Sequence, residues 1–138
     1  MVEKVDHIGI LVEDIESSRE IYERLGVEIV KTERVPEFDV KIAFMSTGTE
    51  LIELVEPLSS DNEFTQLLEK YDQSGLLHHI AFRVTDINAV LRDLKQADVG
   101  LRDSTPRTGA GGAKVAFLEQ RAGNGVNIEL VERDKEVV

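Results

Sequence analysis

The chain has 138 residues, the size of one ordinary domain and enough to bury a hydrophobic core. Its formal net charge of −11 argues against a general nucleic-acid or anionic-membrane binder, because such proteins carry a basic surface. Cysteine is absent, which excludes disulfides, thiolate catalysis and thiolate metal ligands. No secretory signal and no long apolar run is visible, so we expect a cytoplasmic protein that neither spans nor binds a membrane.

The first half of the chain is repeated in the second half. The segment DHIGILVEDI (6–15) returns at an offset of 72 residues as HHIAFRVTDI (78–87). Each half closes on nearly the same apolar strand, LIELVEP (51–57) in the first and NIELVE (127–132) in the second. Two such matches at corresponding places indicate a duplicated structural unit.

Each copy of the opening segment is followed by an amphipathic stretch, ESSREIYERLG or NAVLRDLKQADVG, which predicts a helix. Asp14 and Asp86 stand where an N-cap is expected, and Gly26 and Gly100 stand where each helix should stop. The remaining segments of each half are rich in strand-forming residues. We therefore predict two tandem βαβββ modules, which make an α+β fold with a cleft-shaped sheet.

The predicted domain organisation is one domain over residues 1–138, with modules at about 4–57 and 76–133. The linker at about 58–75 has helical spacing of its apolar residues, and we expect one connecting helix that Gly75 ends. The Gly-rich segment TPRTGAGGAK (105–114) predicts a mobile loop that leads into a strand. An ordinary hairpin and a substrate lid are equally good interpretations of this loop.

Two polar residue types recur at equivalent places in both modules, on the strand face that does not cover the helices. A single histidine on a strand is more often a core residue than a ligand. A glutamate within an apolar strand is rarely buried without a partner, however, and the repetition favours a metal site. The predicted ligands are His7, Glu53, His79 and Glu129. His78 aligns with Asp6 instead and should face the other way.

Two imidazoles and two carboxylates suit a divalent ion of borderline hardness, which includes zinc, cobalt, nickel, manganese and iron. Such a site leaves coordination positions open for substrate oxygens. We expect one divalent ion per chain.

Several segments are similar in order and spacing to the methylmalonyl-CoA epimerases of the vicinal oxygen chelate superfamily, over residues 4–132. These segments are DHIGI, VPEFDVKIAF, IELVEPLSSD, GLLHHIAF, TPRTGAGGAKVAFL and GVNIELVE. The resemblance implies the same four metal ligands, with Co²⁺ as the first choice and Zn²⁺, Ni²⁺ and Mn²⁺ as alternatives. It implies a CoA thioester substrate, a homodimer, and proton transfer at C2 that interconverts (R)- and (S)-methylmalonyl-CoA.

Inversion through a planar enolate needs an acid–base group on each face of the substrate. Some epimerases of this kind carry a separate strand glutamate, but this chain has Ile42 there. We therefore predict that Glu53 and Glu129, which come from opposite modules, serve as catalytic bases as well as ligands. Glu37 is the first alternative base.

Other departures and rivals bear on the substrate. Many relatives have His-Pro where this chain has Glu119 and Gln120, which puts the fine substrate contacts in question. A glyoxalase I (lactoylglutathione lyase)-type isomerase, a metal-free binding protein and a ring-cleaving dioxygenase are the competing functions, and the long linker and the intact ligand set argue against them. The candidates for pairing with CoA phosphates are Arg107, Lys114 and Arg121, which are equally well interpreted as surface charges.

Overall fold

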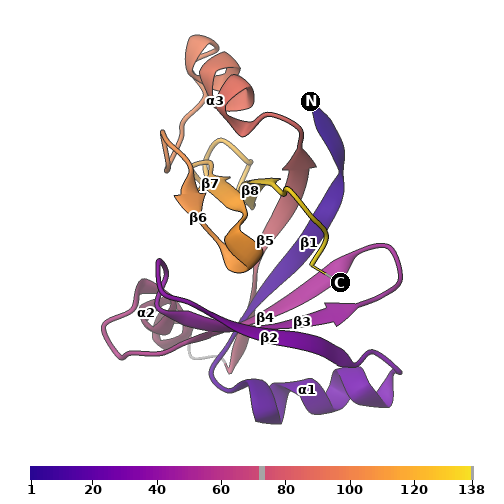
Figure 1. Cartoon of the computed structure of the whole chain (residues 1–138). Coiled ribbons are helices and arrows are strands. Elements are labelled where there is room, and N and C mark those ends of the chain that lie inside the picture. The colour runs from indigo at the N-terminus through magenta and orange to yellow at the C-terminus, as the bar shows by residue number, and fades with distance from the viewer. Residues whose placement is uncertain (72–73, 138) are drawn as a thin grey trace. The chain divides into compact units, whose positions relative to one another are not determined.

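The computed structural model describes residues 1–71 and 74–137, which pack into two compact units. Unit one combines Met1–His7 with His79–Val137, and unit two is Ile8–His78. Figure 1 shows the elements, which in chain order are β1 (Val2–Val12), α1 (Ile15–Arg24), β2 (Ile29–Val35), β3 (Val40–Ser46), β4 (Leu51–Pro57), α2 (Glu63–Lys70), β5 (Gly75–Val84), α3 (Ile87–Gln96), β6 (Arg107–Thr108), the 3₁₀ turn η1 (Ala110–Gly112), β7 (Lys114–Phe117) and β8 (Asn127–Glu132).

This element order confirms the prediction of two βαβββ modules. The compact units nevertheless do not coincide with the modules, because residues 1–7, which include the start of module one, belong to unit one. Strands β1 and β5 therefore each pass from one unit to the other. That all of residues 1–138 form a single domain stays a prediction.

Unit two is built on the antiparallel strands β2, β3 and β4, with β1 next to β4. Helix α1 packs on one face of these strands, as Figure 1 shows. The core on this face contains Val12 and Ile15 together with Ala43, Met45 and Leu54. The alternate residues of β3 and β4 therefore lie on the face away from α1.

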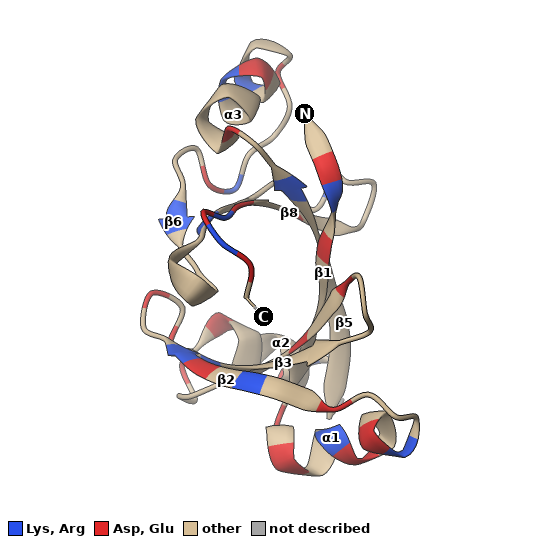
Figure 2. Ribbon diagram, turned by 45° about the vertical axis from the view of Figure 1, so that its right-hand side comes forward, with Lys and Arg blue, Asp and Glu red and all other residues tan. Residues whose placement is uncertain are grey.

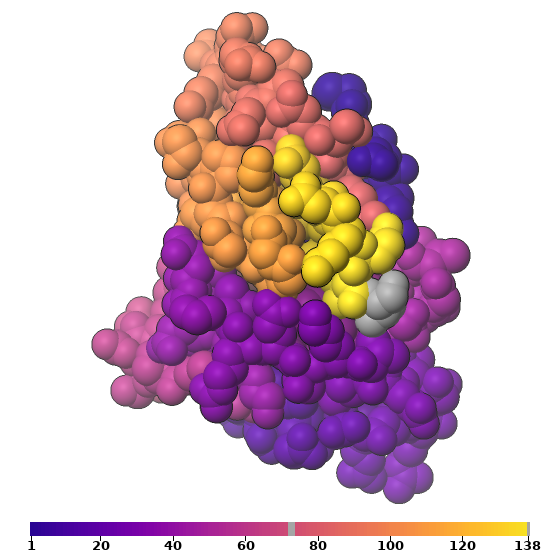
Figure 3. Space-filling model, in the orientation of Figure 1, coloured from indigo at the N-terminus to yellow at the C-terminus, as the bar shows by residue number. Residues whose placement is uncertain are grey.

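In unit one the strand order is β1-β5-β8-β7-β6, with β5 and β8 parallel and the two following pairs antiparallel. Helix α3 covers one face through a core that includes Val84, Ile87, Leu91 and Leu130. The residues after β8, yellow in Figure 3, lie against the orange segment that contains β6 and η1. The loop predicted at 105–114 thus carries a short strand and a 3₁₀ turn.

The predicted helix starts are confirmed, whereas two of the predicted stops are wrong. The carboxylates of Asp14 and Asp86 each accept a hydrogen bond from a backbone N–H in the first turn, at 3.1 Å in both cases. Gly26 follows the C-cap of α1 with φ of 86°, as expected. Gly100 does not end α3, because Asp98 takes the left-handed conformation with φ of 57° two residues earlier.

The linker holds one helix, α2, as predicted, but Gly75 does not end it. Asn62 begins the helix by accepting a hydrogen bond from the backbone N–H of Phe64, and Tyr71 is the C-cap. Gly75 instead begins β5. Residues 72 and 73 of the predicted linker lie outside the described residues.

Each module ties its long helix to its own last strand through a glutamate. In unit two, Glu56 at the end of β4 accepts a hydrogen bond from the backbone N–H of Ile15, at 2.8 Å. In unit one, Glu132 at the end of β8 accepts one from Ile87, at 2.9 Å. A carboxylate at a helix N-terminus is favourable because it meets free N–H groups and the positive end of the helix dipole. The duplication therefore extends to the contact that sets each helix on its sheet.

Charged residues are spread over most elements, and α1 carries both acidic and basic residues, as the red and blue segments of Figure 2 show. Among the described residues, no helix is long and apolar enough to cross a membrane.

Candidate metal centre

Three of the four predicted ligands lie in unit one, on adjacent strands. His7 is on β1, His79 on β5 and Glu129 on β8. The β5–β8 register pairs Ala81 with Glu129, and His79 lies two positions before Ala81. Side chains two positions apart on a strand share a face, so the register places His79 and Glu129 on the same face.

The three side chains converge on one point and are almost completely buried. Their exposed fractions are 3% for His7 and 6% for each of His79 and Glu129. The two Nε2 atoms are 3.1 Å apart, and the imidazole rings are nearly perpendicular at 86°. Oε1 of Glu129 lies 3.0 Å from Nε2 of His7 and 3.6 Å from Nε2 of His79. Each residue thus presents one ligand atom to a shared space.

This donor set fits a divalent ion on two counts. Two donors that are each about 2.1 Å from one ion lie about 3.0 Å apart at a right angle and about 3.4 Å apart at the tetrahedral angle. The three observed separations fall close to that range. Moreover, among the described residues Oε1 of Glu129 has no hydrogen-bond partner, since its contact with His7 lacks hydrogen-bond geometry. A buried carboxylate oxygen without a partner is costly, and a cation removes that cost.

The ring of His79 is held by an aromatic neighbour. Phe117 on β7 meets it edge to face, with ring centroids 5.3 Å apart. Phe117 is also the register partner of Glu129. One buried phenyl ring therefore contacts one candidate ligand and lies on the neighbouring strand beside another.

Asp6 contributes a further charge to this region that the sequence analysis did not assign. It is 1% exposed and its Oδ2 accepts a hydrogen bond from Nδ1 of His7 at 2.7 Å. Nε and Nη2 of Arg83 donate to Oδ1, at 3.0 and 2.8 Å. Arg133 forms a fork, with Nε on Oδ1 at 3.0 Å and Nη2 on Oδ2 at 2.8 Å. The position of Asp6 directly before a predicted ligand was the available signal.

The protonation states in this cluster follow from these contacts. Burial alone would raise the pKa of Asp6, but the hydrogen bonds with His7 and Arg133 and the charge of Arg133 hold that pKa well below its usual range. Hydrogen bonds with Glu136 raise the pKa of Arg83, and the same contact lowers the pKa of Glu136. Asp6 is therefore a carboxylate and both arginines are cations.

Unit two holds the fourth predicted ligand and the histidine that was expected to face elsewhere. Glu53 on β4 is buried, and its register partner is Phe44, on the face away from α1. The ring of His78 packs against Phe64 of α2, with centroids 5.1 Å apart at 70°. This contact agrees with a packing role for His78. The participation of Glu53 in the metal centre stays a prediction.

The three residues predicted to contact CoA phosphates lie in unit one, and two of them lie near carboxylates that partly neutralise their charges. Arg107 is 3.7 Å from Asp103, and Lys114 is 3.5 Å from Glu132. Arg121 is exposed in the turn before β8. Their role toward a CoA moiety stays a prediction.

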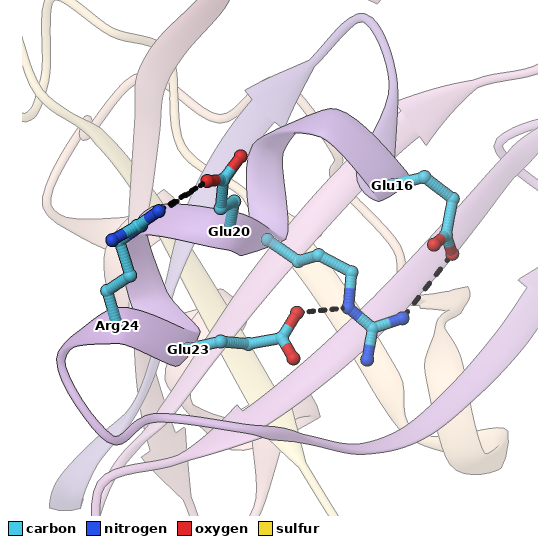
Figure 4. Close-up of a pocket in the computed structure, with 5 residues that line it drawn as sticks. Glu16, Glu20, Glu23 and Arg24 are labelled. Atoms are coloured by element: carbon cyan, nitrogen blue, oxygen red, sulfur yellow. Dashed lines mark hydrogen bonds and ion pairs between the residues drawn. The ribbon is translucent and has the colours of Figure 1, made fainter.

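A surface hollow on α1 has a different character, shown in Figure 4. It is lined by Glu16, Arg19, Glu20, Glu23 and Arg24. Arg19 contacts Glu23 at 2.6 Å, and Arg24 contacts Glu20 at 3.2 Å. These are exposed pairs within one helix, and such solvent-screened pairs add little to stability. The hollow is a solvated helix surface and carries no site.

Comparison with known proteins identifies the family of this chain. Residues 6–117 match the family described as the Glyoxalase/Bleomycin resistance protein/Dioxygenase superfamily. The uncharacterized protein YqjC of Bacillus subtilis is 42% identical, over 94% of this chain and 91% of its own length. The ethylmalonyl-CoA/methylmalonyl-CoA epimerase of Cereibacter sphaeroides is 33% identical, over 94% of this chain and 98% of its own length.

A solved structure and a further relative complete the comparison. A variant of Streptomyces coelicolor methylmalonyl-CoA epimerase in complex with 2-nitronate-propionyl-CoA superposes with a TM-score of 0.88 and 29% identity, covering 98% of this chain and 100% of that one. The lactoylglutathione lyase of Salmonella typhimurium is 29% identical, over 91% of this chain and 90% of its own length.

Proposed function

We propose that this chain is a metal-dependent epimerase. It belongs to the Glyoxalase/Bleomycin resistance protein/Dioxygenase superfamily and has the α+β fold of that family. Its substrate in this proposal is methylmalonyl-CoA, and the reaction interconverts the (R) and (S) forms. The observation that carries the proposal is the buried convergence of His7, His79 and Glu129. Relatives and solved structures named as epimerases of such thioesters support the substrate class.

The reaction requires removal and return of one proton at C2, the carbon between the thioester and the carboxylate. A divalent ion, when bound, supplies the Lewis acidity that favours the enolate. One carboxylate takes the C2 proton from one face of the substrate, and an acid on the opposite face returns a proton. Protons and electrons balance, and no oxidant or co-reactant is needed.

Glu129 and Glu53 are the proposed acid–base pair, and both are also proposed ligands with His7 and His79. They hold equivalent positions in the two modules, on β8 and β4, and both are buried. Burial of a carboxylate in an apolar strand is rare without a function or a partner. The duplicated position is what supports Glu53 as the fourth ligand and the second base.

Two glutamates near β2 are alternatives to Glu53 as the second base. Glu37 lies in the exposed turn between β2 and β3. Glu33 on β2 is the register partner of Ile42 and, with it, lies on the strand face that carries Glu53. Glu33 is half-buried and 3.6 Å from Lys31. If the base is not Glu53, we therefore expect it to be Glu33 rather than Glu37.

A lactoylglutathione lyase activity is the second candidate, since a relative of that name matches over most of the chain. The connecting helix α2 favours the epimerase, because enzymes of the lyase type with this length are expected to have a shorter linker. Cobalt as the ion, a homodimer and a cytoplasmic location stay predictions.

The decisive experiment is proton NMR of methylmalonyl-CoA in heavy water with the metal-loaded protein. We expect catalysed exchange of the C2 proton together with interconversion of the epimers. The control substrate is the hemithioacetal of methylglyoxal and glutathione, on which we expect little activity. The opposite preference would assign the chain to the lyase branch.

A further inference from the structure

Asp6 is a buried charge that the proposed proton transfer does not use. Its two carboxylate oxygens accept hydrogen bonds from His7, Arg83 and Arg133, all in unit one. The side chain of Arg133 is only 3% exposed, and that of Arg83 is 12% exposed. Burial of two guanidinium groups is costly unless they are fully paired, so this arrangement holds Asp6 in one position.

The contact with His7 has a chemical consequence for the candidate metal centre. A carboxylate only accepts hydrogen bonds, so the 2.7 Å contact places the proton of His7 on Nδ1. In a neutral imidazole the other nitrogen, Nε2, then carries a lone pair. That Nε2 is the atom that lies 3.1 Å from Nε2 of His79 and 3.0 Å from Oε1 of Glu129.

The guanidinium groups limit how strongly Asp6 can act on His7. A carboxylate that accepts a hydrogen bond from an imidazole alone attracts the imidazole proton strongly. The carboxylate of Asp6 instead accepts hydrogen bonds from three side chains, so its attraction for the proton of His7 is weaker. Arg133 also reaches the Gly-rich segment, where its Nη1 donates to the carbonyl oxygen of Ala110 at 3.2 Å. Gly111, with φ of 70°, lets the backbone of η1 turn beside that guanidinium. One network therefore runs from η1 through Arg133 and Asp6 to His7.

We propose that Asp6 is a positioning residue that fixes His7 as the Nδ1–H tautomer, and that Arg83 and Arg133 hold it there. The proposal rests on the proposed metal centre but not on the identity of the substrate. Its consequence is that Asp6 sets the affinity for the divalent ion without touching it. Arg133 makes η1 part of the same support.

The first test needs no variant. The chain has three histidines, so nitrogen-15 NMR of the metal-free protein shows three imidazoles, and His7→Gln identifies the signals of His7. At a pH where the rings are neutral, we expect His7 as the Nδ1–H tautomer. Observation of the Nε2–H tautomer would overturn the proposal whatever the variants do.

The second test measures the affinity for Co²⁺ or Zn²⁺ by calorimetry, without substrate. Asp6→Asn keeps the size of the side chain but removes its charge, and loss of such an outer partner weakens metal binding about 10–100-fold. Glu136→Gln is the matched control, because Glu136 is exposed and pairs with Arg83 but not with Asp6. We expect this control to keep the wild-type affinity. An unchanged affinity in a folded Asp6→Asn variant would refute the inference.

Arg133→Met covers the case in which Asp6→Asn does not fold, since Asp6 then keeps its bonds with His7 and Arg83. We expect a smaller loss of affinity and a partial shift of His7 toward the other tautomer, and no change in either would count against the network. His7→Ala separates this inference from the proposed function. If His7→Ala still binds the ion, the assignment of the metal centre is wrong. If His7→Ala loses the ion but Asp6→Asn binds it with wild-type affinity, only the proposed role of Asp6 is refuted.

Discussion

Binding of a divalent ion should raise the thermal stability of this protein, and single ligands can be tested by how much of that rise they remove. The perturbation is addition of Co²⁺ or Zn²⁺ to metal-free wild-type protein and to His7→Ala, His79→Ala and His78→Ala. The first two variants each remove one of the convergent Nε2 atoms. His78→Ala removes an adjacent, equally buried histidine whose ring packs on Phe64.

The size of the effect follows from the site. In the metal-free protein, Oε1 of Glu129 has no hydrogen-bond partner among the described residues, and such a buried group costs about 1–3 kcal/mol. A ligand present at 100 times its Kd stabilises the folded state by about 2.7 kcal/mol. For a chain of this length that corresponds to a rise in Tm of about 10 °C. We expect most of this rise to vanish in the two ligand variants.

The assay is a thermal melt followed by circular dichroism, with and without the ion, after treatment with a chelator. His78→Ala lowers the starting Tm because it loses a buried packing contact, but its metal-dependent rise should remain. A full rise in either ligand variant, or the loss of the rise in His78→Ala, would refute the assignment of the centre.

Two further predictions concern chemistry and packing. Glu53→Gln and Glu129→Gln should keep most of their metal, because an amide oxygen can still coordinate, but lose epimerisation about 10²–10⁴-fold in a C2 exchange assay. Near-wild-type turnover by either fully loaded variant would mean that its glutamate is a ligand only. Gly123→Ala should destabilise the protein by about 1–3 kcal/mol in urea unfolding, since its Cβ would lie 2.1 Å from the backbone oxygen of Val126. Gly100→Ala is the control and should change stability by less than about 0.5 kcal/mol, because its Cβ would meet only a flexible carboxylate side chain that can move away.

Local rules account for the parts of the fold that the sequence analysis predicted correctly. Asp14 and Asp86 cap helices because their short carboxylates reach backbone N–H groups of the first turn, a contact within three residues. The placement of His79 and Glu129 on one face follows from the two-residue period of strands. The repeat then identified the same positions in both modules, which single residues could not have done.

The errors and omissions come from interactions that no local pattern encodes. Gly100 is the predicted helix stop because glycine accepts the left-handed conformation, but an aspartate accepts it as well, and Asp98 adopts it two residues earlier. The support around Asp6 joins residues up to 127 positions apart, which have no common period. Arg133 follows the last predicted strand, where a charged residue is normally interpreted as solvated surface. Its burial is visible only in three dimensions.

The crossing of β1 between the two compact units limits how this protein can be divided. Met1–His7 packs with His79–Val137, so a fragment that ends in the linker would carry His7 away from the unit in which it meets His79 and Glu129. Two fragments cut between the modules would restore the convergent triad only by reassociating. Metal binding by the mixed fragments would then measure that reassociation. By the same logic, a one-module ancestor could have formed such a triad only as a pair of chains that exchanged their first strands.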